Sequence, residues 1–358
     1  MVIFDLIVGN QPNQMSDGGG EKVKFDVVVG NPPYQENIGT AGVNDSLGKQ
    51  LFPNFMKGAI KLSEKYSSMI VPSKWFTGKA QDGSFVNLRE FVVQNNHFQK
   101  ITNYLNGREV FPDVSTGSVM YYLYNRDYTG NVTFSNKQNE RTSTLHRPLF
   151  EDGVDVIIPM NATISILQKV RSTDFDSMEE LVTGRNPFGV LATDKELARK
   201  TIPEEDTSHT IKILCAYEAI RFISRNEITR NYDLLNSWKV FTAKINGGAG
   251  TILDGKPVSV LGKTFVMGPN AACSNTLLAI GSFDSMQEAE NLNSYMKTKF
   301  FRFMLGIKKN ANVLTSNIYS FVPIQDFSKP WMDAELYAKY HLTTDEVSFI
   351  EATIKPMK

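Results

Sequence analysis

Phe25-Asp26-Val27-Val28-Val29-Gly30-Asn31-Pro32-Pro33-Tyr34 is the stretch of sequence that decides the fold. Its first six residues are mostly apolar and end at a glycine, a pattern that predicts a short strand buried on both faces of a sheet. The two prolines then end the strand, because proline has no backbone N–H to donate. Apolar residues recur at helical spacing from residue 47 to about residue 65, so an amphipathic helix is expected next.

Strands and helices continue to alternate after this helix. This order is typical of one half of an open, Rossmann-like α/β sheet with an antiparallel edge. The other half normally comes first in such a chain. The strand at residues 25–30 is therefore expected to have an exposed apolar edge, along which residues 4–8 or a second chain pairs. The further expected elements are a strand at 67–71, a helix at 85–94, a strand at 99–105, and a hairpin made by 119–124 and 131–135.

A polar, irregular stretch at residues 136–153 is typical of a linker between domains. We expect a first α/β domain at residues 1–150, a mixed α+β domain at 151–330 and a helical tail at 331–358. Within the last two regions, the expected elements are helices at 164–170, 178–181 and 285–304, strands near 264–266 and 277–280, and a final helix capped by Thr344.

Composition excludes several classes of protein. The 38 basic residues are balanced by 38 acidic ones, so nucleic-acid binding requires the charges to be segregated in space. No apolar run is long enough to span a membrane, and the cytoplasm is the expected location. The two cysteines, Cys215 and Cys273, are far apart and share no ligand spacing with the four histidines. We therefore expect neither a disulfide framework nor a metal site.

The Asn31-Pro32-Pro33-Tyr34 motif has the chemistry to hold an exocyclic amine such as N6 of adenine. The lone pair of that nitrogen is delocalised into the ring, so the amine is a poor nucleophile. The side-chain carbonyl of Asn31 and the backbone carbonyl of Pro32 can accept both N–H groups and return electron density to the nitrogen. The prolines fix two successive φ angles in advance. The ring of Tyr34 offers a surface on which a flipped base can stack.

The four residues alone also fit a plain strand-terminating turn, since Asn and Pro are common in turns. Their position between a predicted strand and helix favours the catalytic interpretation. Residues 25–35 resemble the catalytic motif of amino-methyltransferases acting on DNA adenine. From residue 22 to residue 358 the chain resembles restriction-modification methylases in which a target-recognition domain follows the catalytic one. Segments that carry this wider resemblance begin at Ser68, Val110, Arg185, Tyr295 and Tyr319.

The resemblance implies a partial methyltransferase domain at residues 1–150 and a DNA target-recognition domain at 151–330. It implies S-adenosylmethionine as methyl donor and DNA as partner, with the target adenine flipped out of the duplex. It assigns Asn31 and Pro32 to the amine, next to Pro33, and Tyr34 to base stacking. Its predicted DNA contacts are Lys74, Trp75, Arg185, Asn186, Phe188, Lys297, Lys299 and Arg302, although loop or core packing would equally explain Trp75 and the aromatic residues after Lys299.

The chain departs from the family pattern in one respect. A glycine-rich cofactor motif is expected upstream of Phe25 and is not found, so the cofactor-binding residues stay unknown. Gly18-Gly19-Gly20 opens no helix, and the glycines at 247–250 lack a strand-to-helix context. Residues 4–14 repeat residues 25–35 with seven identical positions of eleven, as a decayed copy would. The expectation is therefore a methyltransferase portion that needs a complementing chain, with an inactive DNA-binding specificity module or truncated relic as the alternative.

Overall fold

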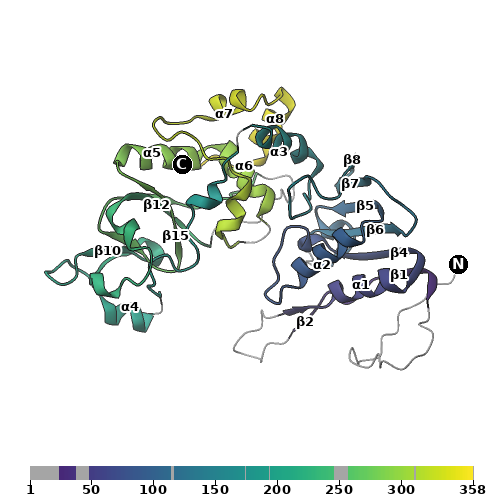
Figure 1. Ribbon diagram of the computed structural model, residues 1–358, viewed down its shortest axis with the longest axis horizontal. Coiled ribbons are helices and arrows are strands. Elements are labelled where there is room, and N and C mark those ends of the chain that lie inside the picture. Colours follow the sequence, from purple (N-terminus) through teal and green to yellow (C-terminus); the bar gives the residue numbers. More distant parts are fainter. Residues whose placement is uncertain are drawn as a thin grey trace. The chain divides into compact units, whose positions relative to one another are not determined.

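The computed structural model describes residues 24–37, 48–113, 117–173, 175–192, 194–245, 257–309 and 312–357. The chain divides into two compact units, Met1–Asn161 and Ala162–Lys358, each with sheets of its own (Figure 1). The sequence placed the first boundary after residue 150, and the first unit extends beyond it to Asn161. Residues 331–358, expected as a separate tail, lie within the second unit. Among the described residues, no helix combines the length and apolarity that crossing a bilayer requires.

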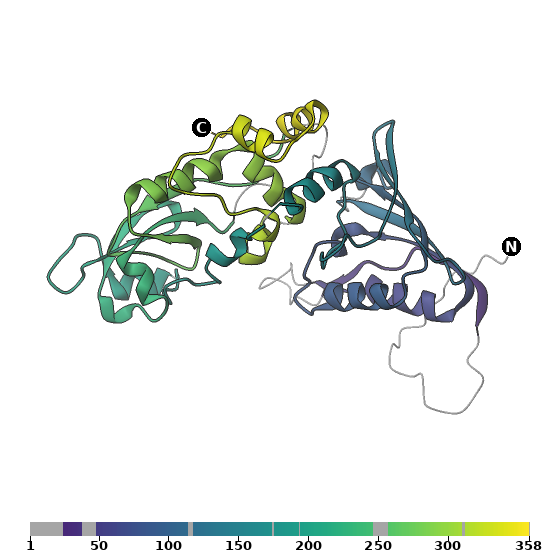
Figure 2. The ribbon, with the colours of Figure 1, turned by 45° about the horizontal axis from the view of Figure 1, so that its top comes forward.

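A six-stranded mixed sheet forms the centre of the first unit. The parallel pairing of its first two strands and the α/β character of the unit confirm the expected fold class. Helices α1 (Phe52–Leu62) and α2 (Ser84–Gln94) contribute to the hydrophobic core on one face of this sheet (Figure 2). In spatial order the strands are β1 (Phe25–Gly30), β4 (Ser63–Pro72), β6 (Val119–Asn125), β5 (Phe98–Tyr104), β7 (Val132–Gln138) and β8 (Arg141–Arg147).

The predicted hairpin of residues 119–124 and 131–135 is wrong. Strand β6 lies between β4 and β5 and is antiparallel to both, whereas β7 pairs in parallel with β5. Met120, Tyr122 and Tyr124 of β6 are all fully buried. A strand with that much apolar and aromatic surface is stabilised most by a central position, where it has hydrogen-bonded neighbours on both sides.

The predicted linker at residues 136–153 is also wrong. Strand β7 runs on to Gln138, turns at Asn139, which has a φ of 53°, and returns as β8. The side-chain amide of Asn161 then donates to the carbonyl oxygens of Phe134 at 2.8 Å and Ser143 at 3.0 Å. The segment is polar because β8 is an exposed edge strand, so its composition resembles that of a linker.

Strand β1 is less buried than its apolar run predicts. Val28 is buried, but Val27 and Val29 are 44% and 56% exposed. Within the described residues β1 pairs only with β4, so one side of its backbone has no strand beside it. Residues 4–8, which the sequence offered as a pairing strand, lie outside the described ranges. Among the described residues that side of β1 has no partner strand, and its pairing with residues 4–8 or with a second chain stays a prediction.

The second unit is a mixed α+β structure, as expected. One sheet pairs β12 (Trp238–Ala243) with β13 (Thr264–Met267) and β15 (Leu277–Phe283), both antiparallel. A second sheet has the order β14 (Ala271–Cys273), β10 (Ile211–Leu214), β11 (Ile220–Ile223) and β9 (Thr201–Ile202). The helices are α3 (Ile164–Arg171), α4 (Asp194–Lys200), α5 (Met286–Lys297), α6 (Lys299–Lys308), α7 (Asp333–Lys339) and α8 (Thr344–Thr353).

Two helix boundaries differ from expectation. The single helix predicted at 285–304 is two helices that meet at Thr298, whose backbone is extended with a ψ of 152°. The Thr298 hydroxyl donates to the Tyr295 carbonyl at 2.7 Å and accepts from the Phe301 N–H at 3.1 Å, so one side chain ends α5 and starts α6. The cap of α8 is Thr343, one residue before the predicted Thr344, and it forms a capping box with Glu346.

Candidate active site

The Asn31-Pro32-Pro33-Tyr34 motif lies at the carboxyl edge of the sheet in the first unit. Gly30, the last residue of β1, is level with Met69 of the parallel strand β4. The segment after β1 and the segment after β4 therefore emerge at the same edge. Open α/β sheets bind ligands at this edge, beyond the carboxyl ends of their strands.

Asn31 offers its amide to solvent. Its side chain is exposed, while Pro32 is buried and Pro33 is exposed. Within the described part of the chain, neither the Asn31 side chain nor the Pro32 carbonyl accepts a hydrogen bond. Both oxygens can accordingly accept from an incoming amine without first breaking a hydrogen bond to a described residue.

Tyr34, unlike the exposed Asn31 side chain, is held in place by packing and by a backbone hydrogen bond. Its ring packs edge-on against Phe52 of α1, with ring centroids 6.5 Å apart, and its carbonyl accepts from the Leu51 N–H at 3.1 Å. Its hydroxyl is buried without a hydrogen-bond partner among the described residues, and burial raises the pKa of the Tyr34 side chain. After the motif, β2 (Gln35–Asn37) pairs with β3 (Gly48–Gln50), which leads directly into α1.

The segment after β4 forms the other side of the candidate site. It begins with a short 3₁₀ helix, η1 (Ser73–Trp75), whose Lys74 is half-buried with its Nζ 5.9 Å from the centre of the Phe85 ring. Burial lowers the pKa of Lys74. Phe85 in turn packs against Phe52 at 5.6 Å, so Lys74 and Tyr34 share an aromatic wall. Trp75 is fully buried, which corrects its assignment as a DNA contact, since a side chain without exposed surface cannot touch DNA.

Sequence reasoning missed Arg89, a buried residue of α2 that holds this segment in place. Its Nη1 donates to the carbonyl oxygens of Trp75 at 2.6 Å and Gly78 at 2.8 Å, and its Nε donates to that of Asp155 at 3.1 Å. Burial lowers the pKa of the guanidinium, although Asp155 and Glu90 oppose this shift. A sequence signal existed, because Arg89 stands among Phe85, Leu88 and Val92 on the apolar stripe of a helix.

In the second unit, the predicted contacts Arg185, Asn186 and Phe188 lie in one turn but face different surroundings. Arg185 is exposed, and Asn186 has a φ of 57°. Phe188 is fully buried and packs against Phe241 at 6.0 Å, so it belongs to the core and its prediction as a DNA contact is corrected.

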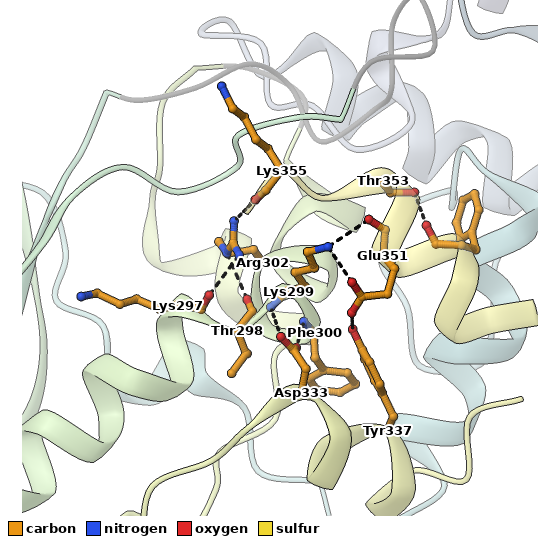
Figure 3. Close-up of polar contacts among 11 residues, drawn as sticks. Lys297, Thr298, Lys299, Phe300, Arg302, Asp333, Tyr337, Glu351, Thr353 and Lys355 are labelled. Atoms are coloured by element: carbon orange, nitrogen blue, oxygen red, sulfur yellow. Dashed lines mark hydrogen bonds and ion pairs between the residues drawn. The ribbon is translucent and has the colours of Figure 1, made fainter. Parts of the chain in front are cut away.

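The three cations near Thr298 differ in their exposure and in their partners (Figure 3). Lys297 is exposed. Lys299 forms an ion pair with Glu351 at 2.6 Å and so has a carboxylate partner already. Arg302 is 3% exposed and donates to the carbonyl oxygens of Thr298, Lys297 and Lys355 at 3.0, 3.0 and 2.5 Å. Its prediction as a DNA contact is corrected, because it joins the α5–α6 junction to the chain after α8.

Asn31 and Pro32 offer hydrogen-bond acceptors for an amine. No binding site for a methyl donor is identified among the described residues. No strand-to-helix connection among them carries the glycine-rich pattern that cradles a nucleotide cofactor. The described part of the chain also contains no group of three or more His, Cys, Asp or Glu side chains placed to bind a metal ion.

Residues 10–111 match the family described as Eco57I restriction-modification methylase. Over 196 residues the chain is 30% identical to an uncharacterized adenine-specific methylase of Mycoplasma pneumoniae, covering 52% of this chain and 40% of that relative. The chain thus spans about two fifths of the length of this curated relative.

Solved structures give weaker likenesses. The DNA complex of the type IIL restriction-modification enzyme MmeI has a TM-score of 0.45 at 10% identity, covering 93% of this chain and 55% of that one. The type IIG restriction endonuclease BpuSI has a TM-score of 0.35 at 13% identity, covering 92% and 49%. The sequence matches are therefore stronger than the structural ones: residues 10–111 are similar to the Eco57I restriction-modification methylase family, and a stretch of 196 residues is similar to an adenine-specific methylase.

Proposed function

We propose that this chain is the adenine-receiving portion of a site-specific DNA adenine N6-methyltransferase of a restriction-modification system. The observation that carries the proposal is Asn31, whose exposed amide follows a parallel strand at the carboxyl edge of the sheet, next to a buried proline. The family match over residues 10–111 includes this motif. The relative from Mycoplasma pneumoniae, described as an adenine-specific methylase, supports the choice of base.

In this proposal the chain holds and activates the amine. The Asn31 side-chain carbonyl and the Pro32 carbonyl accept the two N–H groups of adenine N6, which favours a more tetrahedral and more nucleophilic nitrogen. Tyr34, held edge-on by Phe52, provides a ring against which the flipped base stacks. S-adenosylmethionine, when bound, supplies the methyl group. No charged base is required at the amine, because its proton can leave after methyl transfer.

The described residues form no binding site for the methyl donor, so we propose that a complementing segment or chain supplies it. The side of β1 that pairs with no described strand, where Val27 and Val29 are exposed, is the place at which such a partner would add a parallel strand. DNA is the proposed second partner. Lys74, Arg185, Asn186, Lys297 and Lys299 remain predicted DNA contacts, and the target-recognition role remains a proposal for residues 151–330.

Methyl transfer tests this function. The full chain, mixed with a complementing polypeptide that carries a glycine-rich cofactor segment, is incubated with S-adenosylmethionine and duplex DNA, and the nucleosides are identified by mass spectrometry. We expect N6-methyladenine, and methylation at cytosine instead would contradict the proposal. Calorimetry of the chain alone with S-adenosylmethionine separates the two parts of the account. Micromolar binding would show that the donor site lies in this chain after all.

A further inference from the structure

A turn in the second unit presents Arg185 on a firmly anchored backbone. Gly189 has a φ of +81°, and a Cβ atom there would lie 1.8 Å from Oγ1 of Thr229, so only glycine fits. The Thr229 N–H donates to the Phe188 carbonyl at 3.1 Å, and the Asn231 side-chain amide donates to the Pro187 carbonyl at 2.6 Å. Buried Phe188 secures the same turn from within. The exposed Arg185 therefore projects from a turn whose backbone is held by hydrogen bonds and by the packing of Phe188.

The residues after this turn connect it to a second cation, Lys244. The Asn275 N–H donates to the Val190 carbonyl at 3.0 Å, and the Ala192 N–H donates to the Asn275 side-chain oxygen at 2.9 Å. The Lys244 Nζ donates to the backbone carbonyl of the same Asn275 at 3.3 Å. The backbone of Lys244 is fixed too, because its N–H donates to Thr276 at 2.9 Å and its carbonyl accepts from Leu314 at 2.7 Å.

Strand β15 brings the two cations together. Thr183, two residues before Arg185, donates its N–H to the Ala279 carbonyl at 2.9 Å, and Ala243, which precedes Lys244, pairs with Leu277 of the same strand. The pKa of Lys244 is lowered first by burial and second by the positive charge of Arg185. No described carboxylate forms an ion pair with either side chain. Like charges held together by an anchored backbone are unfavourable in the free protein, and a bound anion relieves that repulsion.

We propose that Arg185 and Lys244 together bind one phosphate of the DNA backbone. The forked guanidinium of Arg185 suits a phosphate, and Lys244 adds a point charge on the other side. A phosphate contact fixes the register of the protein on the duplex and does not itself read the bases. The inference rests on the proposed function in that its ligand is DNA. No pattern in the sequence points to Lys244.

The test is the salt dependence of DNA binding by the full chain, measured by fluorescence anisotropy with a short labelled duplex between about 50 and 200 mM NaCl. The variants are Arg185→Ala, Lys244→Met and the double variant. Methionine keeps the aliphatic part of the lysine side chain, which limits any loss of packing. The control is Lys263→Ala, which removes the same charge from the same unit but from a lysine already paired with Glu218. Thermal unfolding of each variant checks the fold.

Each phosphate contact contributes about 0.9 to the slope of log K against log salt. We expect the double variant to lose about 0.9 of that slope, each single variant to lose at least half as much, and Lys263→Ala to lose none. A loss of about 1.8 in the double variant would mean two separate phosphates and would overturn the shared site. An unchanged slope in the double variant would overturn it as well, while leaving the methyltransferase proposal intact. A wild-type chain without DNA affinity would contradict both.

Discussion

Arg89 of α2 donates from its guanidinium to the backbone carbonyl of Trp75 at 2.6 Å. This hydrogen bond joins α2 to the segment that follows β4. A second hydrogen bond, to the carbonyl of Gly78, holds the other end of that segment. The segment shares its sheet edge with Asn31. The position of Lys74 beside the proposed base site therefore depends on a buried charge that never touches the substrate.

Replacing Arg89 should loosen this segment selectively. Arg89→Lys keeps the charge but cannot reach three carbonyl groups, and we expect it to cost about 2–4 kcal/mol of unfolding free energy. Hydrogen exchange at residues 73–78 should accelerate more than exchange in the strands. Arg141→Met, at an exposed position of β8, is the matched control and should change neither quantity. Uniform acceleration across the first unit would show a general loss of stability in place of a local positioning role.

Tyr34 should tolerate the loss of its hydroxyl but not of its ring. The hydroxyl is buried without a partner among the described residues, so Tyr34→Phe should leave the melting temperature unchanged or raise it. The ring stacks on the base in the proposed mechanism, so Tyr34→Ala should weaken binding of adenine-containing DNA by about 1–3 kcal/mol. Melting curves and DNA titrations of the two variants give these values. Equal DNA affinities for the two variants would remove Tyr34 from its stacking role.

Arg302 should act on stability and not on DNA binding. Its guanidinium serves three backbone carbonyls, so Arg302→Met should lower the unfolding free energy by about 2–3 kcal/mol. The salt dependence of DNA binding should stay at the wild-type slope in conditions where the variant is folded. Lys297→Ala, at an exposed neighbouring position, should leave stability unchanged. A reduced slope in folded Arg302→Met would restore Arg302 as a phosphate contact.

Lys239 should make stability depend on pH. It is fully buried with its Nζ on the carbonyls of Ser237 and Gly268, and burial lowers its pKa from 10.5 to about 8. Between these two values the unfolded chain binds more protons than the folded chain, so this group favours folding increasingly as pH rises. Relative to Lys239→Met, wild type should gain about 1–2 kcal/mol between about pH 7.5 and 9.5 in urea unfolding. A constant difference would mean that the pKa of Lys239 is not lowered.

The local elements of the first unit could be read from the sequence because they follow from apolar periodicity. The helix predicted at 85–94 is Ser84–Gln94, and the strand predicted at 99–105 is Phe98–Tyr104. The place of β6 in the sheet could not be read, because strand order is decided by long-range packing of residues such as Tyr122. Strand β8 was missed because an exposed edge strand lacks an apolar alternation.

The features of the site that depend on local secondary structure could be predicted from the sequence. Those that depend on tertiary packing could not. The position of Asn31 after a strand follows from the apolar run that precedes it. The burial of Trp75, Phe188 and Arg302 depends on residues distant in sequence, and a charged or aromatic residue type alone does not reveal it. The same is true of Lys244, whose neighbour Arg185 lies 59 positions earlier in the chain.

The central claim is that Asn31 holds the adenine amine during methyl transfer. Its most direct test is the rate of N6-methyladenine formation by Asn31→Ala and by Asn131→Ala in the complemented assay. Asn131 is an exposed asparagine that precedes β7, at the opposite edge of the same sheet. We expect Asn31→Ala to abolish transfer while DNA affinity stays near wild type, and Asn131→Ala to change neither. Wild-type transfer by Asn31→Ala would contradict the account.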